Sequence, residues 1–389
     1  MMTKVKAWTD KHIHGDPVIW MVVICLSVIS ILVVYSSTGS LAYKHKGGNT
    51  EYYLFRHSFM VILGLVVMWV AHKIDYRYYS KIARYALIAS VPLLIYAWQY
   101  GVTINEASRW IVLPFIGLQF QPSDLAKMAL IAALAGMLAK KQGKIADIKE
   151  SLIPMLLWCG AICGLIAMAN FSTAIMLFLT SMLLLFIGRV PVKYLGMLFL
   201  VGIIAGFIAV KIGDRGPTLI NRMTEFISPT ELPHQVEQSY IAVSTGGVLG
   251  KGPGKSDQRN FLPEAFSDFV FAIIVEEYGM LGGAFVLFLY LVLLYRGMRV
   301  VANSDRAFGG LLSAGLSFAI VIQAMVNIGV VVGLGPVTGQ PLPLISMGGT
   351  SLLFTGLSLG IILSVSRGEQ EDFSALSGVM RNTAKTAEA

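Results

Sequence analysis

The chain has 389 residues, of which 56% are hydrophobic and only 13% are charged, and its mean hydropathy is +0.70. Long apolar runs with so little charge are typical of polytopic membrane proteins, and they exclude a soluble globular protein. The net charge of +8 does not indicate nucleic-acid binding, because we expect the Lys and Arg residues to follow membrane topology.

Ten apolar runs of roughly spanning length, at about 20 residues per helix, predict ten transmembrane helices. We expect the first run to be a retained helix rather than a cleaved signal peptide, because no small-residue cleavage site follows it. The runs are Pro17–Ser36, Leu54–Ala71, Tyr85–Tyr100, Leu125–Ala139, Leu152–Ala169, Thr173–Gly188, Tyr194–Val210, Leu281–Val301, Phe308–Gly333 and Ser351–Ser366.

The distribution of basic residues orients these helices. With the N-terminal residues 1–16 in the cytoplasm, 19 of the 30 Lys and Arg residues fall on the cytoplasmic side. The outer side holds ten, six of them in a single long loop, where the positive-inside rule has little force. The sequence therefore predicts an all-α polytopic membrane protein with both termini cytoplasmic, a membrane domain at 17–367 and a C-terminal tail at 368–389.

The loop at 211–280 is much longer than the others. Loops of this length in compact proteins are usually functional or disordered. Aromatic residues occur at intervals along this loop, so we expect it to be ordered and packed on the outer membrane face. The three cysteines, Cys25, Cys159 and Cys163, lie in apolar runs without His or Cys partners, and we expect inert thiols.

The stretch Phe261–Gly282 carries four carboxylates, and its second one, Asp268, lies just before an apolar run. That position is typical of a helix N-cap, where backbone N–H groups favour the ionised form. Residues alone leave a purely structural capping role as probable as a catalytic one. A continuous helix from Phe269 to Val301 would be about 50 Å long, against a hydrocarbon core of about 30 Å. We therefore expect the helix to project outward or to break at its glycines, Gly279, Gly282 and Gly283.

Glu276 follows Asp268 by eight residues, or about 12 Å along a helix axis. It could support the site or neutralise a cation. Glu264 and Glu277 are expected to be mainly structural.

Other polar residues lie close to or within predicted spans. Asp124 and Lys127 are spaced i, i+3 after Pro122, so Lys127 is either functional or paired locally with Asp124. Arg109 stands beside a Trp in an outer loop and is suited to binding a phosphate. Gln323 and Asn327 are spaced i, i+4, and we expect both to hold neighbouring segments together.

Two segments are rich in glycine. The segment Gly333–Ser351 contains three prolines and five glycines, so it cannot be helical throughout and must be buried in protein or line a cavity. The segment Ser244–Gly254 lacks nucleotide-binding spacing, and we expect it to be flexible.

Four motifs in chain order resemble the SEDS family (shape, elongation, division and sporulation) of bacterial membrane proteins that polymerise peptidoglycan strands. They are Ser108-Arg109-Trp110 with Gln121-Pro122-Ser123-Asp124 and Lys127; Gln238–Ala242 with the following glycines; Leu262-Pro263-Glu264 through Asp268 to Gly279; and Asn327 through Gly329 with Ser346-Met347-Gly348-Gly349-Thr350-Ser351. Within the family, the chain looks more like the division member than the elongation member.

The resemblance implies a fold, a reaction and a set of residues. The substrate would be lipid II, a disaccharide-peptide on undecaprenyl pyrophosphate, and the transfer would invert the anomeric centre. Asp268 would be the general base, and Arg109, Lys127, Gln121 and Asp124 would lie near the pyrophosphate. Glu276, Asn327, Ser346 and Gly348 would line or support the cavity. A divalent cation, Mg²⁺ or Mn²⁺, could also stabilise the leaving group.

The resemblance also implies partners and a location. They are a class B penicillin-binding protein and other division proteins, at the septum in the bacterial cytoplasmic membrane, with no nucleic acid. Two departures from the family pattern are visible: Asn170 stands where an Asp is usual, and Asp124 stands where Glu is common. The alternatives are a lipid II flippase, which needs no base, and a non-enzymatic scaffold for the penicillin-binding protein.

Overall fold

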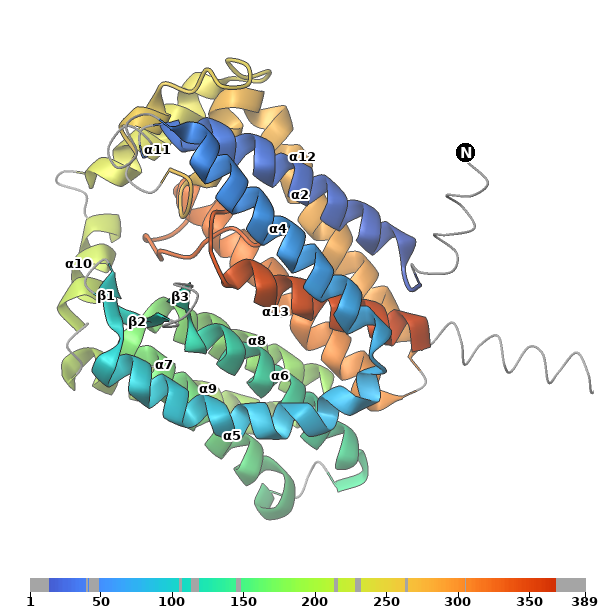
Figure 1. The fold of residues 1–389 in the computed structure, drawn as a ribbon. Helices are drawn as coiled ribbons and strands as arrows, with labels where there is room; N and C mark the ends of the chain where they lie inside the picture. Colours follow the sequence, from blue (N-terminus) through green and yellow to red (C-terminus); the bar gives the residue numbers. More distant parts are fainter. Residues whose placement is uncertain are drawn as a thin grey trace, which may run out of the picture.

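The computed structural model describes residues 14–39, 41, 49–104, 107–112, 119–144, 148–212, 216–227, 232–262, 265–304 and 306–368. Apolar helices make up most of these residues (Figure 1). They are α2 (Pro17–Ser37), α4 (Thr50–Lys73), α5 (Tyr76–Tyr100), α6 (Pro122–Lys140), α7 (Ile153–Ala169), α8 (Phe171–Ile187), α9 (Val192–Ile212), α12 (Val270–Asn303), α13 (Ala307–Val331) and a last helix, Ser351–Gly368.

Within the described residues, nine of these helices are long and apolar enough to cross a membrane, and the tenth, α8, has 17 residues. The predicted polytopic helical fold is therefore confirmed. α2 begins and the last helix ends at the same end of the bundle (Figure 1), as an even number of spans requires. At that end Arg296 of α12 binds Asp16, with 2.6 Å from Nε to Oδ2.

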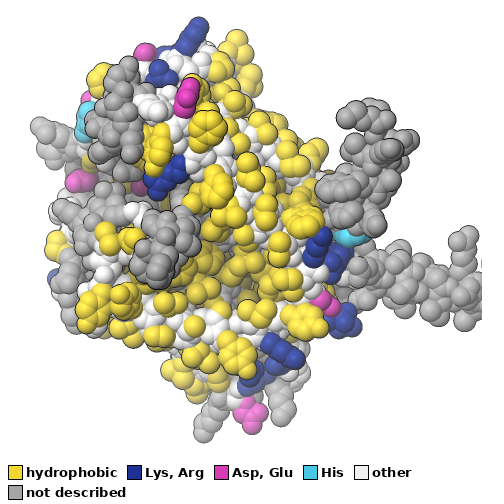
Figure 2. All heavy atoms as spheres, viewed as in Figure 1, with side chains coloured by type: hydrophobic (Ala, Val, Ile, Leu, Met, Phe, Trp, Pro, Cys, Tyr) yellow, Lys and Arg dark blue, Asp and Glu magenta, His cyan; other side chains and the backbone are white. Residues whose placement is uncertain are grey.

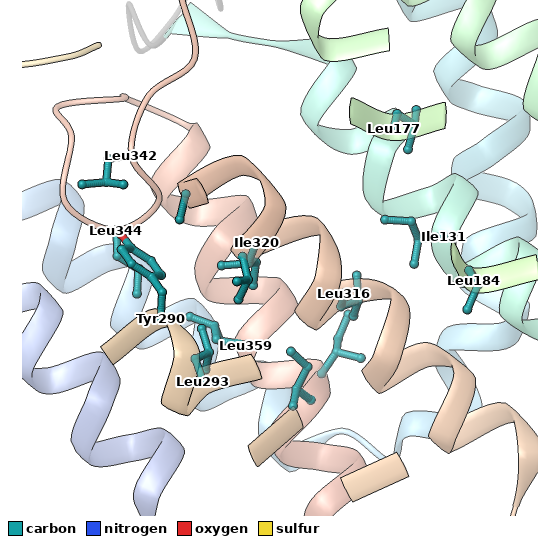
Figure 3. Packing of buried hydrophobic residues seen from close by; sticks show 14 of the residues in the cluster. Ile131, Leu177, Leu184, Tyr290, Leu293, Leu316, Ile320, Leu342, Leu344 and Leu359 are labelled. Carbon is teal, nitrogen blue, oxygen red and sulfur yellow. The ribbon is translucent and has the colours of Figure 1, made fainter. Parts of the chain in front are cut away.

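The helices form two neighbouring groups (Figure 1). α2, α4, α12, α13 and the last helix lie together, and α5 to α9 lie beside them. The groups pack through α13 against α6 and α8, and Figure 3 shows Ile131 and Leu177 facing Leu316 across this contact. This packing buries the inner faces, while apolar side chains on the outer faces stay exposed, as lipid-facing surfaces require.

The surface agrees with a membrane position. Figure 2 shows hydrophobic side chains covering the middle of one face, over α2, α4 and α5. Lys and Arg side chains lie on both sides of this hydrophobic area, and several of them lie near the end where α2 begins. The three cysteines are free, and Cys159 is buried, as the sequence predicted.

A small antiparallel sheet lies at the opposite end of the bundle and was not predicted (Figure 1). β1 (Val102–Ile104) pairs with β2 (Ala107–Val112), and β2 pairs with β3 (Gln119–Phe120), in the order β1-β2-β3. Strands this short carry too few alternating residues for a period-two pattern to be recognised. The sheet leads directly into α6, and thus positions the start of that helix.

The remaining described elements are short. They are η1 (Gln142–Lys144), η2 (Ile148–Leu152), α10 (Gly216–Ile227), α11 (His234–Gly246) and η3 (Gln258–Asn260). The last three belong to the long outer loop, which is ordered at these elements, as expected. The loop ends earlier than predicted, because α12 begins at Val270 rather than after Met280.

α12 is broken at Gly279, which has φ +71° and ψ −174°, so of the two expected outcomes, outward projection or a break at a glycine, the break is present. The glycine-rich segment pairs with the freed backbone: Lys251 N donates to Glu276 O and Met280 N donates to Gly247 O, each at 2.9 Å. A Cβ on Gly279 would lie 2.2 Å from Val248 O, so only glycine fits there. The prediction that Ser244–Gly254 is flexible was therefore wrong, because this segment supplies the hydrogen-bond partners that the broken helix needs.

Candidate active site

Asp268 lies in the turns at 265–269 that lead into α12, at the end of the bundle that carries the sheet. Its side chain is half-buried, and Oδ1 accepts a hydrogen bond from Ser267 Oγ at 3.0 Å. A carboxylate in this position is accessible to a substrate, yet its orientation is restricted. That combination suits a general base.

The N-cap residue of α12 is Phe269, so Asp268 lies one residue before the position at which the sequence predicted the cap. Asp268 belongs to the turns that directly precede the helix. The structural role near the helix end and the catalytic role both stay predictions for this residue.

The backbone around Asp268 is held by a long loop at 333–350. Asn327 Nδ2, at the end of α13, donates to Asp268 O and to Gln340 O, both at 2.7 Å. Ser346 Oγ donates to Ser267 O at 2.6 Å, and Met347 N donates to Phe266 O at 2.9 Å. The predicted supporting roles of Asn327 and Ser346 therefore have a structural basis, since both bind the main chain beside the carboxylate.

This loop is non-helical, as predicted, and it is buried at residues 342–346. Gln323 Nε2 donates to Pro341 O at 2.9 Å, and Tyr290 OH donates to Pro343 O at 2.5 Å. Figure 3 shows Tyr290 beneath the loop, close to Leu344. The polar side chains of the spans thus satisfy the carbonyl groups of a non-helical segment at membrane depth.

Gly339 and Gly348 occupy different parts of the loop. A Cβ on Gly339 would lie 3.5 Å from Asp268 Oδ2, so Gly339 borders the carboxylate. Gly348 is half-buried, and its carbonyl accepts from Ser351 N at 3.1 Å at the start of the last helix. Of the two, Gly339 is the one that lies beside Asp268. Its position could not be predicted, because nothing in the sequence distinguishes it from the other glycines of the loop.

Asp124 and Lys127 form an ion pair on the first turns of α6, with 2.9 Å between Lys127 Nζ and Asp124 Oδ1. The Asp124 side chain is 6% exposed, and its Oδ2 has no hydrogen-bond partner among the described residues. Gln121 precedes the helix and donates from Nε2 to Ser123 Oγ at 2.8 Å. The local pairing that the sequence left open is therefore present, and it compensates the charge of Lys127.

A cavity of about 60 Å³ opens beside this ion pair, between α6, α8, α13 and the last helix. Met128, Met176, Leu177 and Phe354 contribute an apolar lining, and Gln323 a polar one. Asp268 is not among the described residues that line it. The loop separates the two places, with Pro343 in the cavity wall and Gly339 beside Asp268.

Arg109 lies on β2, and its side chain falls outside the described residues, as does the whole of Glu264. The sheet that carries Arg109 is tied to the loop, because Thr350 Oγ1 donates to Gln119 O on β3 at 2.9 Å. The backbone of β3, just before Gln121, thus lies against the end of the loop at 333–350.

Glu276 is fully buried and has a structural role. Its carboxylate binds Lys251 Nζ at 2.7 Å and Asp257 N at 3.2 Å, and it also accepts from Gln258 N and Ser256 Oγ. The hydrogen bond that Lys251 Nζ donates to Glu276 raises the pKa of the Lys251 ammonium. Glu276 therefore neutralises a cation, one of the two roles that the sequence left open, and its oxygens are already occupied.

Glu277 is also buried and accepts a hydrogen bond from Ser36 Oγ of α2, which agrees with its expected structural role. Asn170, the departure from the expected Asp, caps α8: its Oδ1 accepts from Thr173 N at 3.2 Å. Thr173 Oγ1 in turn accepts from Gln340 Nε2 at 2.9 Å, so this turn also supports the loop. In the described part of the chain, no three His, Cys, Asp or Glu side chains are grouped as metal ligands.

Comparisons with known proteins agree with this arrangement. Residues 16–371 match the sequence model of the FtsW/RodA/SpoVE family, described as cell cycle proteins. A probable peptidoglycan glycosyltransferase FtsW of Geobacter sulfurreducens is 35% identical over 358 residues, covering 90% of this chain and 95% of the relative.

Two solved structures have the same fold. One is a chain from a structural study of how a peptidoglycan synthase complex coordinates polymerization and crosslinking. Its TM-score is 0.73 and its sequence identity is 27%, and the match covers 92% of this chain and 99% of the other. The other is the rod shape determining protein RodA of Thermus thermophilus, with a TM-score of 0.67 and 27% identity, covering 92% of this chain and 98% of the other. The chain therefore belongs to the FtsW/RodA/SpoVE family of polytopic membrane proteins.

Proposed function

We propose that this protein is a peptidoglycan glycosyltransferase that polymerises lipid II at the outer face of the bacterial cytoplasmic membrane during cell division. A relative in Geobacter sulfurreducens is named a probable peptidoglycan glycosyltransferase FtsW, which supports the activity and the division role. The observation that carries the proposal is the position of Asp268, a half-buried carboxylate whose main chain is held by Asn327 and whose Oδ1 accepts from Ser267.

The proposed reaction is a single displacement. An acceptor sugar hydroxyl attacks the anomeric carbon of the donor, the bond from that carbon to the pyrophosphate oxygen breaks, and the anomeric centre is inverted. Asp268 takes the proton of the attacking hydroxyl, and the electron pair of the broken bond leaves with the pyrophosphate. Ser267 orients the carboxylate through its hydrogen bond to Oδ1.

The pyrophosphate requires positive charge. Among the described residues, Lys127 is the candidate for this positive charge. Because Asp124 already forms an ion pair with Lys127, we propose that the pyrophosphate competes with Asp124 for the ammonium group. Arg109 is proposed as the second cation, from the outer sheet. Gln121 at the start of α6 is proposed to donate to the same phosphates.

The divalent cation stays a prediction. Proteins often hold Mg²⁺ with one or two carboxylates together with substrate phosphates. Asp268 and Asp124 are the carboxylates that would be available for this. The described residues form no metal cage of their own, and none of the proposed steps depends on a bound cation.

We further propose a class B penicillin-binding protein as partner and the division septum as the location. The support for the partner is the similarity of this fold to a chain studied in a peptidoglycan synthase complex. The test is co-purification of the two full-length proteins from membranes.

The enzyme is distinguished from a flippase by an assay in detergent with purified lipid II, because detergent leaves no bilayer to flip across. Wild-type protein should produce glycan chains, and Asp268→Asn should produce none above about 1% of the wild-type rate. The variant keeps the acceptor oxygen that binds Ser267 and leaves the main-chain contacts intact. Asp257→Asn, at an exposed carboxylate, is the matched control and should be active. Full activity of Asp268→Asn would remove the proposed base.

A further inference from the structure

Two polar side chains inside the spans, Ser30 of α2 and His57 of α4, have no part in the proposed function so far. Ser30 is fully buried and His57 is 1% exposed. Their Oγ and Nε2 atoms lie 2.7 Å apart. An ionisable side chain within a span is costly, and so it indicates a function.

The direction of the hydrogen bonds follows from a second contact. Ser30 Oγ donates to Ile345 O, in the loop at 333–350, at 2.8 Å. Because a hydroxyl group has a single proton, His57 Nε2 must be the donor to Ser30 Oγ. His57 Nδ1 has no hydrogen-bond partner among the described residues, which agrees with a ring that carries its proton on Nε2.

Ile345 belongs to a tight turn at 342–347. Its N–H and that of Ser346 both donate to Leu342 O, at 3.2 and 2.9 Å. Leu344 has φ +65°, a left-handed conformation that is strained for a leucine and persists only when its surroundings hold it. The turn therefore depends on its contacts with the spans.

The other side of the same turn binds the residues before Asp268. Ser346 Oγ donates to Ser267 O at 2.6 Å, and Met347 N donates to Phe266 O at 2.9 Å. Ser30 is thus connected with the main chain that carries Asp268 by its hydrogen bond to Ile345 O, the turn, and the two hydrogen bonds from Ser346 and Met347. Without the Ser30 hydroxyl, the buried Ile345 carbonyl would lose its side-chain donor and the turn could shift.

We propose that Ser30 and His57 are positioning residues that fix the turn at 342–347 and, through it, the Asp268 carboxylate. This inference rests on the proposed function. A displacement of about 1 Å at a reacting group can lower a rate by about 100-fold, so buried side chains in α2 and α4 can control the reaction without touching substrate.

The test compares four variants of the full-length protein. Ser30→Ala removes the donor to Ile345, and His57→Phe keeps an aromatic ring without the donor to Ser30. His57→Gln retains a side-chain N–H. Ser27→Ala is the matched control, because Ser27 lies one turn earlier on α2 and its buried hydroxyl has no hydrogen-bond partner among the described residues.

Ser30→Ala and His57→Phe should each lower kcat for polymerisation about tenfold at an unchanged KM for lipid II. His57→Gln should keep most of the rate, and Ser27→Ala all of it. A wild-type kcat in Ser30→Ala, alongside an inactive Asp268→Asn, would overturn the positioning role and leave the proposed function intact.

A second measurement does not depend on activity. Hydrogen–deuterium exchange at residues 265–269 and 342–347 should be at least about threefold faster in Ser30→Ala than in wild type or Ser27→Ala. Unchanged exchange would overturn the inference even if activity falls. Full activity of Asp268→Asn would overturn the proposed function, while the exchange would still show whether Ser30 holds the turn.

Discussion

Asp268 and Glu276 are carboxylates only eight residues apart, and their surroundings differ in kind. Glu276 is fully buried and its oxygens are occupied by Lys251, Ser256 and two backbone N–H groups. The Asp268 side chain is half-buried and accepts from Ser267, while the stronger constraints act on its main chain. A carboxylate with occupied oxygens stabilises a fold, whereas one held by its backbone can accept a proton from a substrate.

The same contrast applies to the two loops that these residues bind. The segment Ser244–Gly254, whose Lys251 binds Glu276, forms hydrogen bonds with the backbone on both sides of the break in α12 at Gly279. The loop at 333–350 binds the main chain of Phe266 and Ser267, the two residues before Asp268. Changes at Asp268 and in the loop at 333–350 should therefore lower activity. Changes at Glu276 and in the segment Ser244–Gly254 should lower stability.

The largest effect is expected when the Asp268 carboxylate is moved without being removed. Asp268→Glu adds one methylene, so the carboxylate is displaced by about 1 Å or more, and the polymerisation rate should fall about 100-fold. The melting temperature should stay within about 2 °C of wild type. Asp257→Glu, at an exposed carboxylate, serves as control. Wild-type activity in Asp268→Glu would show that the position of this group is not critical.

A loss of stability is expected at the other carboxylate. Glu276→Ala leaves Lys251 and several buried donors without their acceptor, so the free energy of unfolding should fall by about 3 kcal/mol. Thermal unfolding in detergent measures this change. The activity of the folded fraction should remain. Selective loss of activity at an unchanged melting temperature would assign Glu276 to the chemistry instead.

An intermediate effect is expected at Asn327. Asn327→Ala removes the donors to Asp268 O and Gln340 O, and the polymerisation rate should fall about tenfold. Ser313→Ala removes a buried hydrogen bond to Gly297 O elsewhere on α13 and is the matched control. Equal losses of rate in the two variants would mean that Asn327 acts only through general stability.

The smallest effect concerns pH. Because Glu276 raises the pKa of Lys251 in the folded state, this pair stabilises the protein below the unfolded pKa of Lys, about 10.4. That stabilisation should be lost as the pH rises through the raised pKa, and because Lys251 is partly exposed it should amount to at most about 1 kcal/mol. Melting temperatures between pH 7 and 11 should show an alkaline decline that Lys251→Met reduces. An unchanged decline in Lys251→Met would contradict this assignment.

Hydropathy and charge were sufficient to predict the helical membrane fold, because spans must satisfy their backbone groups internally and so depend little on distant residues. The i, i+3 spacing likewise indicated that Asp124 and Lys127 could pair, as one of two alternatives, and the pair is present. Helix length predicted that the helix at 269–301 projects outward or breaks at a glycine, and a break lies at Gly279.

Features that depend on distant contacts could not be predicted in this way. The flexibility assigned to Ser244–Gly254 was wrong, because the hydrogen-bond partners of this segment lie in α12. The contacts from Ser346 to Ser267 and from Ser30 to Ile345 join residues 79 and 315 positions apart. His57 could have been noticed as an ionisable residue in an apolar run, but the sequence did not reveal its partner.

The central claim is that Asp268 carries the chemistry while Glu276 carries structure. It is tested most directly by measuring the polymerisation rate and the melting temperature of Asp268→Asn and Glu276→Gln in the same detergent with purified lipid II. We predict that Asp268→Asn loses at least about 100-fold in rate at a wild-type melting temperature, and that Glu276→Gln melts lower while its folded protein remains active. The reverse pattern, an active Asp268→Asn beside a fully stable but inactive Glu276→Gln, would contradict the account.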